Sequence, residues 1–290
     1  HQFGPARLPD VQRIQQCPAR SDRRRRFCGG AGRSAAGGDC RDGRNRHSGR
    51  ADAPPRWHGF EGVGFHSDRI AQIEDAVDVD LFKPSGTRLA DLSGPPESER
   101  AINVGLVGRI EPAKRQLEFI RGALEVNRRF AGQVRFVLVG EVRNHDYGVR
   151  VSRLAQAGGL NGQLLLAGRR DDMPDVLNSL DVLVSLSGGS VMYEAMSCGL
   201  CVVSAGFTRP GESIHLRDGE TGIVTPTADP VALAEILGNL IEHPDMRHRL
   251  GTAARAWAQQ RLSHTAIVSR TVAFYDRLLG VRRQQGPVLR

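Results

Sequence analysis

The chain has 290 residues and a net charge of +8 that is unevenly distributed. Residues 1–60 contain thirteen Arg and five Asp with no Lys or Glu, which accounts for the whole excess, and the other 230 residues contain 27 basic and 27 acidic side chains. A body of that size can bury a large core, and its balanced charge excludes nucleic acid as a partner for the folded part.

Residues 1–66 are rich in Arg and Gly and poor in branched aliphatic side chains. A segment of this kind cannot bury enough apolar surface to offset its ordering entropy, so we predict that it is largely disordered or non-native. Three interpretations are open: a basic arm for nucleic acid, a flexible tail, and GC-rich DNA read in the wrong frame. We favour the third as a hypothesis, and His1 in place of Met also suggests a fragment.

The five cysteines imply no disulfide framework. Cys198 and Cys201 have the spacing of half a zinc or redox site, but no second pair follows them, and we expect neither chemistry. The sequence contains no run of 18 apolar residues and no signal-peptide pattern. We therefore expect a cytoplasmic protein. A peripheral position at the inner face of the membrane is compatible with this expectation.

From Ile102 onward, short apolar runs alternate with amphipathic stretches. The runs predict strands at residues 102–107, 134–139, 163–167, 181–186, 201–205 and 222–224. The amphipathic stretches predict helices at residues 114–130, 149–157, 173–180, 190–197, 230–241, 248–260 and 265–279. Apolar strands joined by helices predict an α/β domain at residues 101–280, with a Rossmann-like parallel sheet covered by helices on both faces. Ligands bind such sheets at the carboxyl ends of the strands, so the loops there are the candidate sites.

The loop after the first strand carries Gly108, Arg109, Lys114 and Arg115. The dipole of a helix disfavours cations in its first turn, typically by about 0.3–1 kcal/mol, so Lys114 and Arg115 indicate an anion nearby. Arg109 and Lys114 can clamp a diphosphate, with each charge-assisted hydrogen bond contributing roughly 1.5–3 kcal/mol. Two solvated surface charges are the alternative.

The loop after the fourth strand carries paired glycines and leads into a helix that contains Glu194. The turn and helix start consist of Ser187, Gly188, Gly189, Ser190 and Val191. Glycines let the backbone approach a ligand closely, and free amides at a helix start favour phosphate oxygens. Glu194 can accept hydrogen bonds from both hydroxyls of a ribose. An ordinary turn and a surface acid are the alternatives.

Four phrases, taken together and in this order, resemble the C-terminal domain of family 4 glycosyltransferases, which have the GT-B fold. "VGRIEPAK" resembles V-G-R-x-x-x-x-K, "YEAMSCGLCVVSAG" resembles L-E-A-M-A-x-G-x-P-V-V, and "RDGETGIVTPTADPVALAEIL" resembles D-G-x-T-G-x-L-V-x-x-x-D followed by a helix. "IEDAVDVDLFKP" at residues 73–84 is similar to the family's interdomain phrase, so residues 67–100 are interpreted as a remnant of the interdomain region.

The resemblance implies transfer of a sugar from a nucleotide-diphosphate sugar, with retention, to an unknown acceptor that is a glycan, a lipid or a small molecule. It implies no metal and no cofactor. Arg109, Lys114 and Glu194 become the catalytic residues, with Glu194 holding the ribose. The turn at residues 187–191 becomes the cradle for the diphosphate, and Gly168 and Arg169 come to lie near the base. Asp171, Asp172 and Asp175 are interpreted as a helix N-cap with an acidic N3 residue rather than as a metal site.

The chain departs from the family at two places. The family's first carboxylate, eight residues before Glu194, is Leu186 here, or Ser187 if a gap is shifted. No acceptor-binding domain is recognisable before residue 67, so we expect a donor half without its acceptor half, which transfers sugar very slowly or not at all. The alternative to a glycosyltransferase is a catalytically inactive sugar-nucleotide-binding protein or a gene remnant. A second alternative is another enzyme, a GT-B sugar-nucleotide epimerase. Residues 281–290 are interpreted as a tail.

Overall fold

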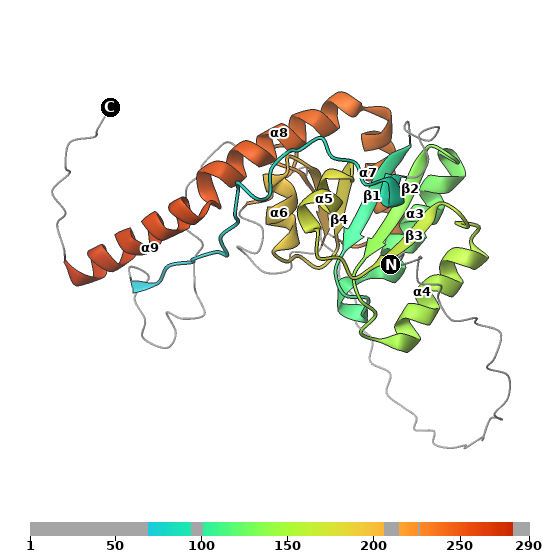
Figure 1. The fold of residues 1–290 in the computed structure, drawn as a ribbon, viewed down its shortest axis with the longest axis horizontal. Coiled ribbons are helices and arrows are strands. Elements are labelled where there is room, and N and C mark those ends of the chain that lie inside the picture. Colours follow the sequence, from blue (N-terminus) through green and yellow to red (C-terminus); the bar gives the residue numbers. More distant parts are fainter. Residues whose placement is uncertain (1–68, 94–100, 206–214, 226, 281–290) are drawn as a thin grey trace, which may run out of the picture. The chain divides into compact units, whose positions relative to one another are not determined.

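The computed structural model describes residues 69–93, 101–205, 215–225 and 227–280 (Figure 1). All of these residues belong to the second of the two units into which the chain divides, Ala53–Arg290. The predictions for residues 1–66 and 281–290 lie outside the described residues.

Six parallel strands form one sheet, in the order β3-β2-β1-β4-β5-β6. The strands are β1 (Ile102–Val107), β2 (Val134–Val139), β3 (Leu164–Gly168), β4 (Val182–Ser185), β5 (Cys201–Ala205) and β6 (Ile223–Thr225). Each lies within one residue, at both ends, of the strand predicted from the apolar runs. The prediction of a Rossmann-like parallel sheet is therefore confirmed.

Helices cover both faces of this sheet, as Figure 1 shows. The helices are α2 (Ala90–Ser93), α3 (Gln116–Arg129), α4 (His145–Ala157), α5 (Met173–Asn178), α6 (Val191–Ser197), α7 (Pro230–Glu242), α8 (Pro244–Arg261) and α9 (His264–Leu279). Successive side chains of a strand point to opposite faces. Phe136 and Leu138 of β2 accordingly pack with α3, α4 and α7, whereas Val137 and Val139 pack with α5, α6 and α8. None of the described helices is both long and apolar enough to cross a membrane.

Two helices begin four residues earlier than predicted. The side chain of Asn144 accepts a hydrogen bond from the backbone N–H of Tyr147 at 2.9 Å, which caps α4 at its first turn. Helix α8 begins at Pro244, whose fixed φ suits the first helical position. These starts are set by single residues, a capping side chain in α4 and a proline in α8, which apolar periodicity does not reveal.

The strand order places a topological switch point between β1 and β4. From β1 the chain passes through α3 to β2 on one side, and from β4 it passes through α6 to β5 on the other side. Open α/β sheets bind ligands in the crevice outside the carboxyl ends of the strands at such a point. The loops after β1 and β4, which hold the predicted diphosphate residues, therefore lie next to each other at this crevice.

The described residues before β1 pack against the domain. Leu92 is fully buried with side chains of α5, α6 and α8, and the Val77 backbone N–H donates to Leu262 O at 2.8 Å. Glu74 lies 2.8 Å from Arg270 Nη2 and 3.4 Å from His215 Nε2, and its side chain is only 6% exposed. Burial alone would raise the pKa of Glu74, but hydrogen bonding and the charges of His215 and Arg270 hold it below its ordinary value.

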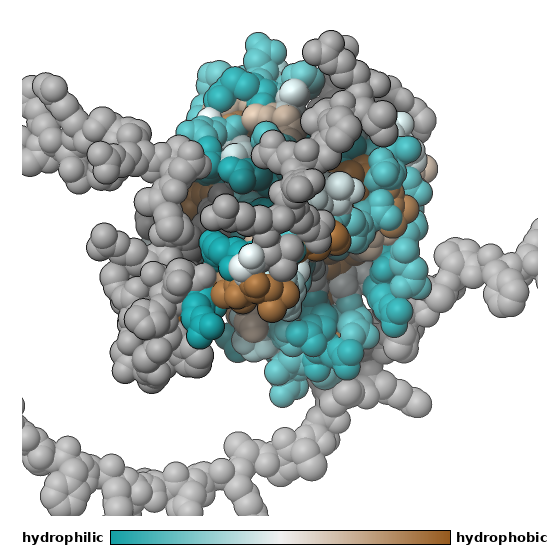
Figure 2. Space-filling model, turned by 90° about the vertical axis from the view of Figure 1, so that its left-hand side faces the viewer, coloured by the Kyte–Doolittle hydropathy of each residue, from teal (hydrophilic) through white to brown (hydrophobic). Residues whose placement is uncertain are grey.

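Large apolar side chains are exposed at few places in the described part of the chain. The face in Figure 2 is mainly hydrophilic, with a small apolar group near its centre. Four of the nine exposed large apolar residues lie on α9, namely Val268, Tyr275, Leu278 and Leu279. Apolar exposure among the described residues is thus concentrated on this last helix.

Candidate functional site

The carboxyl ends of β1, β2 and β3 are joined by backbone hydrogen bonds. Gly108 N–H donates to Val139 O, and Gly140 N–H donates to Gly168 O, each at 2.8 Å. A Cβ atom on Gly140 would lie 2.1 Å from Gly108 O, and the φ of Gly140 is +146°, so only glycine fits there. This contact fixes the height of the Gly108 turn relative to β2.

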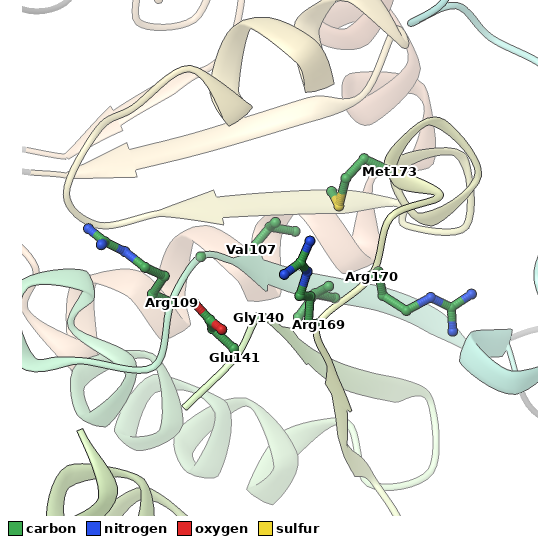
Figure 3. A pocket seen from close by; sticks show the side chains of 9 residues that line it. Val107, Arg109, Gly140, Glu141, Arg169, Arg170 and Met173 are labelled. Atoms are coloured by element: carbon green, nitrogen blue, oxygen red, sulfur yellow. The ribbon is translucent and has the colours of Figure 1, made fainter. Parts of the chain in front are cut away.

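A hollow of about 220 Å³ opens beside these strand ends (Figure 3). It is lined by Val107, Gly108, Arg109, Val139, Gly140, Glu141, Arg169, Arg170 and Met173. In Figure 3, Arg169 extends toward the middle of the hollow, while Arg170 extends away from it toward α2. The predicted residues Gly108, Arg109 and Arg169 are therefore brought together around one hollow. Gly168 precedes Arg169 without lining the hollow, and its φ of +66° favours glycine.

Two neighbouring arginines at the end of β3 have different surroundings. Arg169 pairs with Asp171 at 3.2 Å, and both side chains are largely exposed. Arg170 is only 20% exposed and pairs with Asp172 at 2.6 Å and with Asp91 of α2. Asp172 is the N-cap residue of α5, as predicted, but its carboxylate makes no cap hydrogen bond because Arg170 holds it. Arg169 is thus available to a ligand, and Arg170 is a structural residue.

The loop after β1 differs from the prediction in where the helix begins. Residues Pro112–Lys114 form a 3-10 turn, Arg115 has a left-handed φ of 58°, and α3 begins only at Gln116. Lys114 and Arg115 are therefore not in the first turn of α3, and the argument from its dipole does not apply to them. The side-chain amide of Gln116 instead donates to Arg109 O at 2.8 Å and holds the loop in place.

Lys114 reaches across the crevice. A Cβ atom built on Gly108 would lie 3.5 Å from Lys114 Cδ, and one built on Gly189 would lie 3.8 Å from Lys114 Nζ. The alkyl chain therefore passes over the β1 turn, and the ammonium group ends beside the glycines that follow β4. Among the described residues, no carboxylate pairs with this ammonium group. Arg109 differs, because it pairs with Glu111 at 3.1 Å and its side chain is 58% exposed.

The turn after β4 lies beside the ammonium group of Lys114. Gly188 and Gly189 have φ values of 69° and 121°, and the hydroxyl groups of Ser185 and Ser187 lie 3.4 and 3.5 Å from Gly188 O. Ser190 precedes α6 without a side-chain cap. Within the described part of the chain, the N–H groups of Gly189, Ser190 and Val191 find no acceptor. They can donate to an anion held by Lys114.

Glu194 lies one turn into α6 and is half-buried. Burial raises the pKa of its carboxyl group, and the described residues supply no hydrogen-bond or ion-pair partner to it. A carboxylate that is desolvated and unpaired has a free capacity to accept hydrogen bonds from a ligand.

Leu186 and Ser187, the two candidate positions for an acid before α6, differ in packing. Leu186 is 2% exposed and belongs to the core cluster with Val182 and Val184, whereas Ser187 is exposed at the crevice. Neither side chain is acidic. Ser187 is therefore the one of these two residues that is exposed at the crevice.

Cys198 and Cys201 are buried free thiols in two different core clusters, and burial raises the pKa of each to about 12. Burial of this kind lowers the reactivity of a thiol. The described residues contain no group of three or more His, Cys, Asp or Glu side chains arranged to hold a metal ion.

Glu111, Glu141 and Met173 belong to the site although we did not predict them. Glu111 neutralises Arg109, and Glu141 and Met173 line the hollow. Glu141 follows Gly140 at the carboxyl end of β2, so the rule that ligands bind at strand ends could have identified it. Met173 gives no such signal, because it reads as the first residue of a core helix.

A protein-family model described as "Glycosyl transferases group 1" matches residues 93–257, which is more than half of the chain. The chain belongs to this family. Among curated relatives of this group 1 chain, D-inositol 3-phosphate glycosyltransferase of Streptomyces scabiei is 28% identical over 210 residues, covering 66% of this chain and 45% of that protein. Phosphatidyl-myo-inositol mannosyltransferase of Mycobacterium leprae is 29% identical over 216 residues, covering 70% and 54%. The chain thus spans about half the length of the curated relatives it matches.

The fold of this group 1 chain is similar to that of HepE from Anabaena, whose crystal structure contains UDP and glucose. The two are 25% identical with a TM-score of 0.63, and the match covers 74% of this chain and 60% of that one. The described domain is therefore the Rossmann-like C-terminal half of a GT-B fold.

Proposed function

We propose that the crevice between β1 and β4 binds the diphosphate of a nucleotide sugar, and that this domain is the donor half of a retaining glycosyltransferase of family 4. The path of Lys114 supports this most directly, because its ammonium group has no carboxylate partner among the described residues and ends beside the Gly189 turn. A cation and several N–H donors directed at one place form an anion site. HepE, a similar protein, has been crystallised with UDP and glucose.

During transfer, the bond between the anomeric carbon and a diphosphate oxygen breaks, and a bond from that carbon to an acceptor oxygen forms. Negative charge then develops on the leaving diphosphate. Lys114, Arg109 and the N–H groups of the turn would stabilise that charge, and donors fixed in advance act most strongly where charge develops. These groups can take the role that a metal ion has in other transferases, so we propose transfer without a metal or cofactor.

The remaining predicted residues would hold the nucleoside. Glu194 would accept hydrogen bonds from the ribose hydroxyls, which would compensate its desolvated carboxylate. The hollow at Gly168 and Arg169 would receive the base, with Met173 and Val107 as apolar contacts. Backbone groups would supply most polar contacts to the base.

Acceptor and location extend this proposal. We propose an acceptor that is a glycan, a lipid or a small molecule. Inositol phosphate and phosphatidylinositol are the first candidates to test, because the names of both relatives include inositol. We further propose a cytoplasmic protein, with peripheral contact at the inner face of the membrane if the acceptor is a lipid.

Binding of a nucleotide sugar without transfer is the second candidate function. It is favoured by the lack of a carboxylate at Leu186 and Ser187, where the family has its first acid.

Calorimetry with the full chain tests the proposal. UDP, GDP, ADP and their sugar conjugates are titrated into the wild type and into Lys114→Met. We expect at least one diphosphate to bind to the wild type and to bind more weakly to the variant. Lack of binding by every diphosphate would refute the assignment of the crevice. If a conjugate binds, release of its nucleoside diphosphate with and without the inositol acceptors separates transfer from binding alone.

A further inference from the structure

Residues 74–85, here named the strap, are held against the domain by side chains from three helices. Arg270 of α9 pairs with Glu74, and Arg255 of α8 contacts the middle of the strap. Asn178 of α5 donates to Lys83 O at 3.0 Å and accepts from Ser85 N–H at 2.9 Å. In Figure 1 the strap is the blue-green segment that crosses α8 before it reaches α2.

Arg255 joins the strap to the end of α6 through a single nitrogen atom. Its Nη1 atom lies 2.8–2.9 Å from four oxygens: the carbonyl oxygens of Val79, Phe82 and Ser197, and the hydroxyl of Ser197. The Ser197 hydroxyl itself donates to Phe82 O at 2.6 Å. One cationic nitrogen thus sits among oxygens of two segments that are more than 100 residues apart in the chain.

Two glycines make this joint tight. A Cβ atom on Gly251 of α8 would lie 2.1 Å from Gly199 O, so α8 touches the turn after α6 through backbone alone. Gly199 has a φ of +74°, and a Cβ atom there would lie 3.4 Å from Pro84 Cγ and 3.9 Å from Arg255 Cβ. The strap, α6 and α8 therefore meet at one point with no room for adjustment.

Helix α6 is short and meets this joint at its carboxyl end. It has only seven residues, and a helix this short has little stability of its own. Ser197 O is one of the carbonyl groups at the C-terminus of α6 that have no partner within a helix, and the cation of Arg255 donates to it there. Glu194 lies less than one turn away, and Glu194 O accepts a hydrogen bond from Cys198 N–H at 2.9 Å.

We propose that Arg255 is a positioning residue for nucleotide binding: it fastens the carboxyl end of α6 to the strap and so fixes Glu194 and the Gly189 turn at the other end of the helix. The inference rests on the proposed function for its ligand, but the geometric part concerns the unliganded chain. Loss of Arg255 would free α6 to shift without disturbing the loop of Arg109, which is held by Gln116 and by β2.

The first test is hydrogen exchange of the unliganded chain, with Arg255→Met, Arg255→Lys and Arg249→Met compared with the wild type. Arg249 lies on the same helix and makes one exposed hydrogen bond, to Gly219 O at 3.1 Å, so it is a matched control. We expect faster exchange at residues 78–85 and 192–197 in Arg255→Met, with unchanged exchange in β2 and α4. Arg255→Lys should restore most of the protection, because all the contacts come from one nitrogen and an ammonium group has three donors.

The second test is a double-mutant cycle on the affinity for UDP. Arg255→Met should weaken UDP roughly tenfold, and the effect of Glu194→Gln should become several-fold smaller in that background, because coupled residues are not additive. The effect of Arg109→Met should stay the same in both backgrounds. A general loss of stability would not produce this selectivity.

The outcomes separate the two proposals. Unchanged exchange at residues 192–197 in Arg255→Met, or additive effects of the Arg255 and Glu194 substitutions, would overturn the positioning role. If the wild type binds no nucleoside diphosphate, the proposed function fails, and the positioning of Glu194 for nucleotide binding fails with it, whatever the exchange data show. A third outcome would also overturn the inference: Arg255→Met speeds exchange in α6 but binds UDP as tightly as the wild type does. Arg255 would then hold α6 without any effect on the ligand.

Discussion

Lys114→Met should weaken UDP binding much more than Arg109→Met, although the sequence assigns both residues the same role. Lys114 has no ion-pair partner among the described residues and gains one when the diphosphate binds. A charge-assisted hydrogen bond contributes about 1.5–3 kcal/mol, so its loss should raise the Kd about 10- to 150-fold. Arg109 must give up its ion pair with Glu111, 3.1 Å away, in order to bind the phosphate. Replacing one largely exposed ion pair by another contributes only about 0.5–1 kcal/mol, so Arg109→Met should raise the Kd about two- to fivefold.

Isothermal titration calorimetry at one fixed salt concentration measures both effects. Lys83 is the only other lysine of the chain, and it is exposed in the strap, so Lys83→Met is a control that removes the same charge elsewhere. The control should bind UDP as the wild type does. Equal losses for Lys114→Met and Arg109→Met, or a loss for Lys83→Met as large as that for Lys114→Met, would refute the reasoning from the crevice geometry.

Three further predictions concern Glu194, Glu74 and Gly140. Glu194→Gln should weaken UDP binding about tenfold or more. In urea unfolding above pH 5, the unliganded variant should be as stable as the wild type or more stable, because the raised pKa of Glu194 means that the fold disfavours its ionised carboxylate. The pKa of Glu74 is lowered in the fold, so its contribution is fully present above the unfolded pKa of about 4.3 and is lost as the pH falls through the lowered folded pKa. Glu74→Gln should cost about 2 kcal/mol at pH 7, and the difference from wild type in urea unfolding should shrink as the solution is acidified. Gly140→Ala should lower both the melting temperature and UDP affinity, because its Cβ would meet Gly108 O, whereas Gly132→Ala, with a φ of +76° and open space around it, should cost about 1–2 kcal/mol of stability and leave affinity unchanged.

The sheet could be predicted closely from the sequence because buried parallel strands are apolar along their whole length. A run such as that of β2 stands out from the amphipathic helices on either side. Helix starts were predicted less well, because they depend on single capping side chains such as Asn144 and on the fixed φ of Pro244. Periodicity alone does not detect a cap.

The candidate site was predicted as a set of loops but not as a network of partners. The position of Lys114 depends on the 3-10 turn and on the left-handed Arg115, and neither follows from the residue types in the loop. The contact of Arg255 with the strap joins residues separated by 173 and 176 positions. Contacts over such separations are set by the packing of α8 on α6, which a reading of local pattern does not reach.

The alternation of side chains along β4 predicts that the chain tolerates an acid at position 187 but not at position 186. Val182, Val184 and Leu186 share one face and are buried in the same core cluster, whereas Ser187 leaves the strand exposed at the crevice. A carboxylate at position 186 would be buried without a partner, which costs about 3–5 kcal/mol, whereas one at position 187 would stay solvated. Leu186→Glu should therefore lower the urea midpoint strongly, and Ser187→Glu should leave it nearly unchanged. If acceptor-dependent release of UDP from UDP-glucose rises in Ser187→Glu, the serine limits transfer. If Leu186→Glu is as stable in urea as Ser187→Glu, the core does not extend to this turn and the reasoning is wrong.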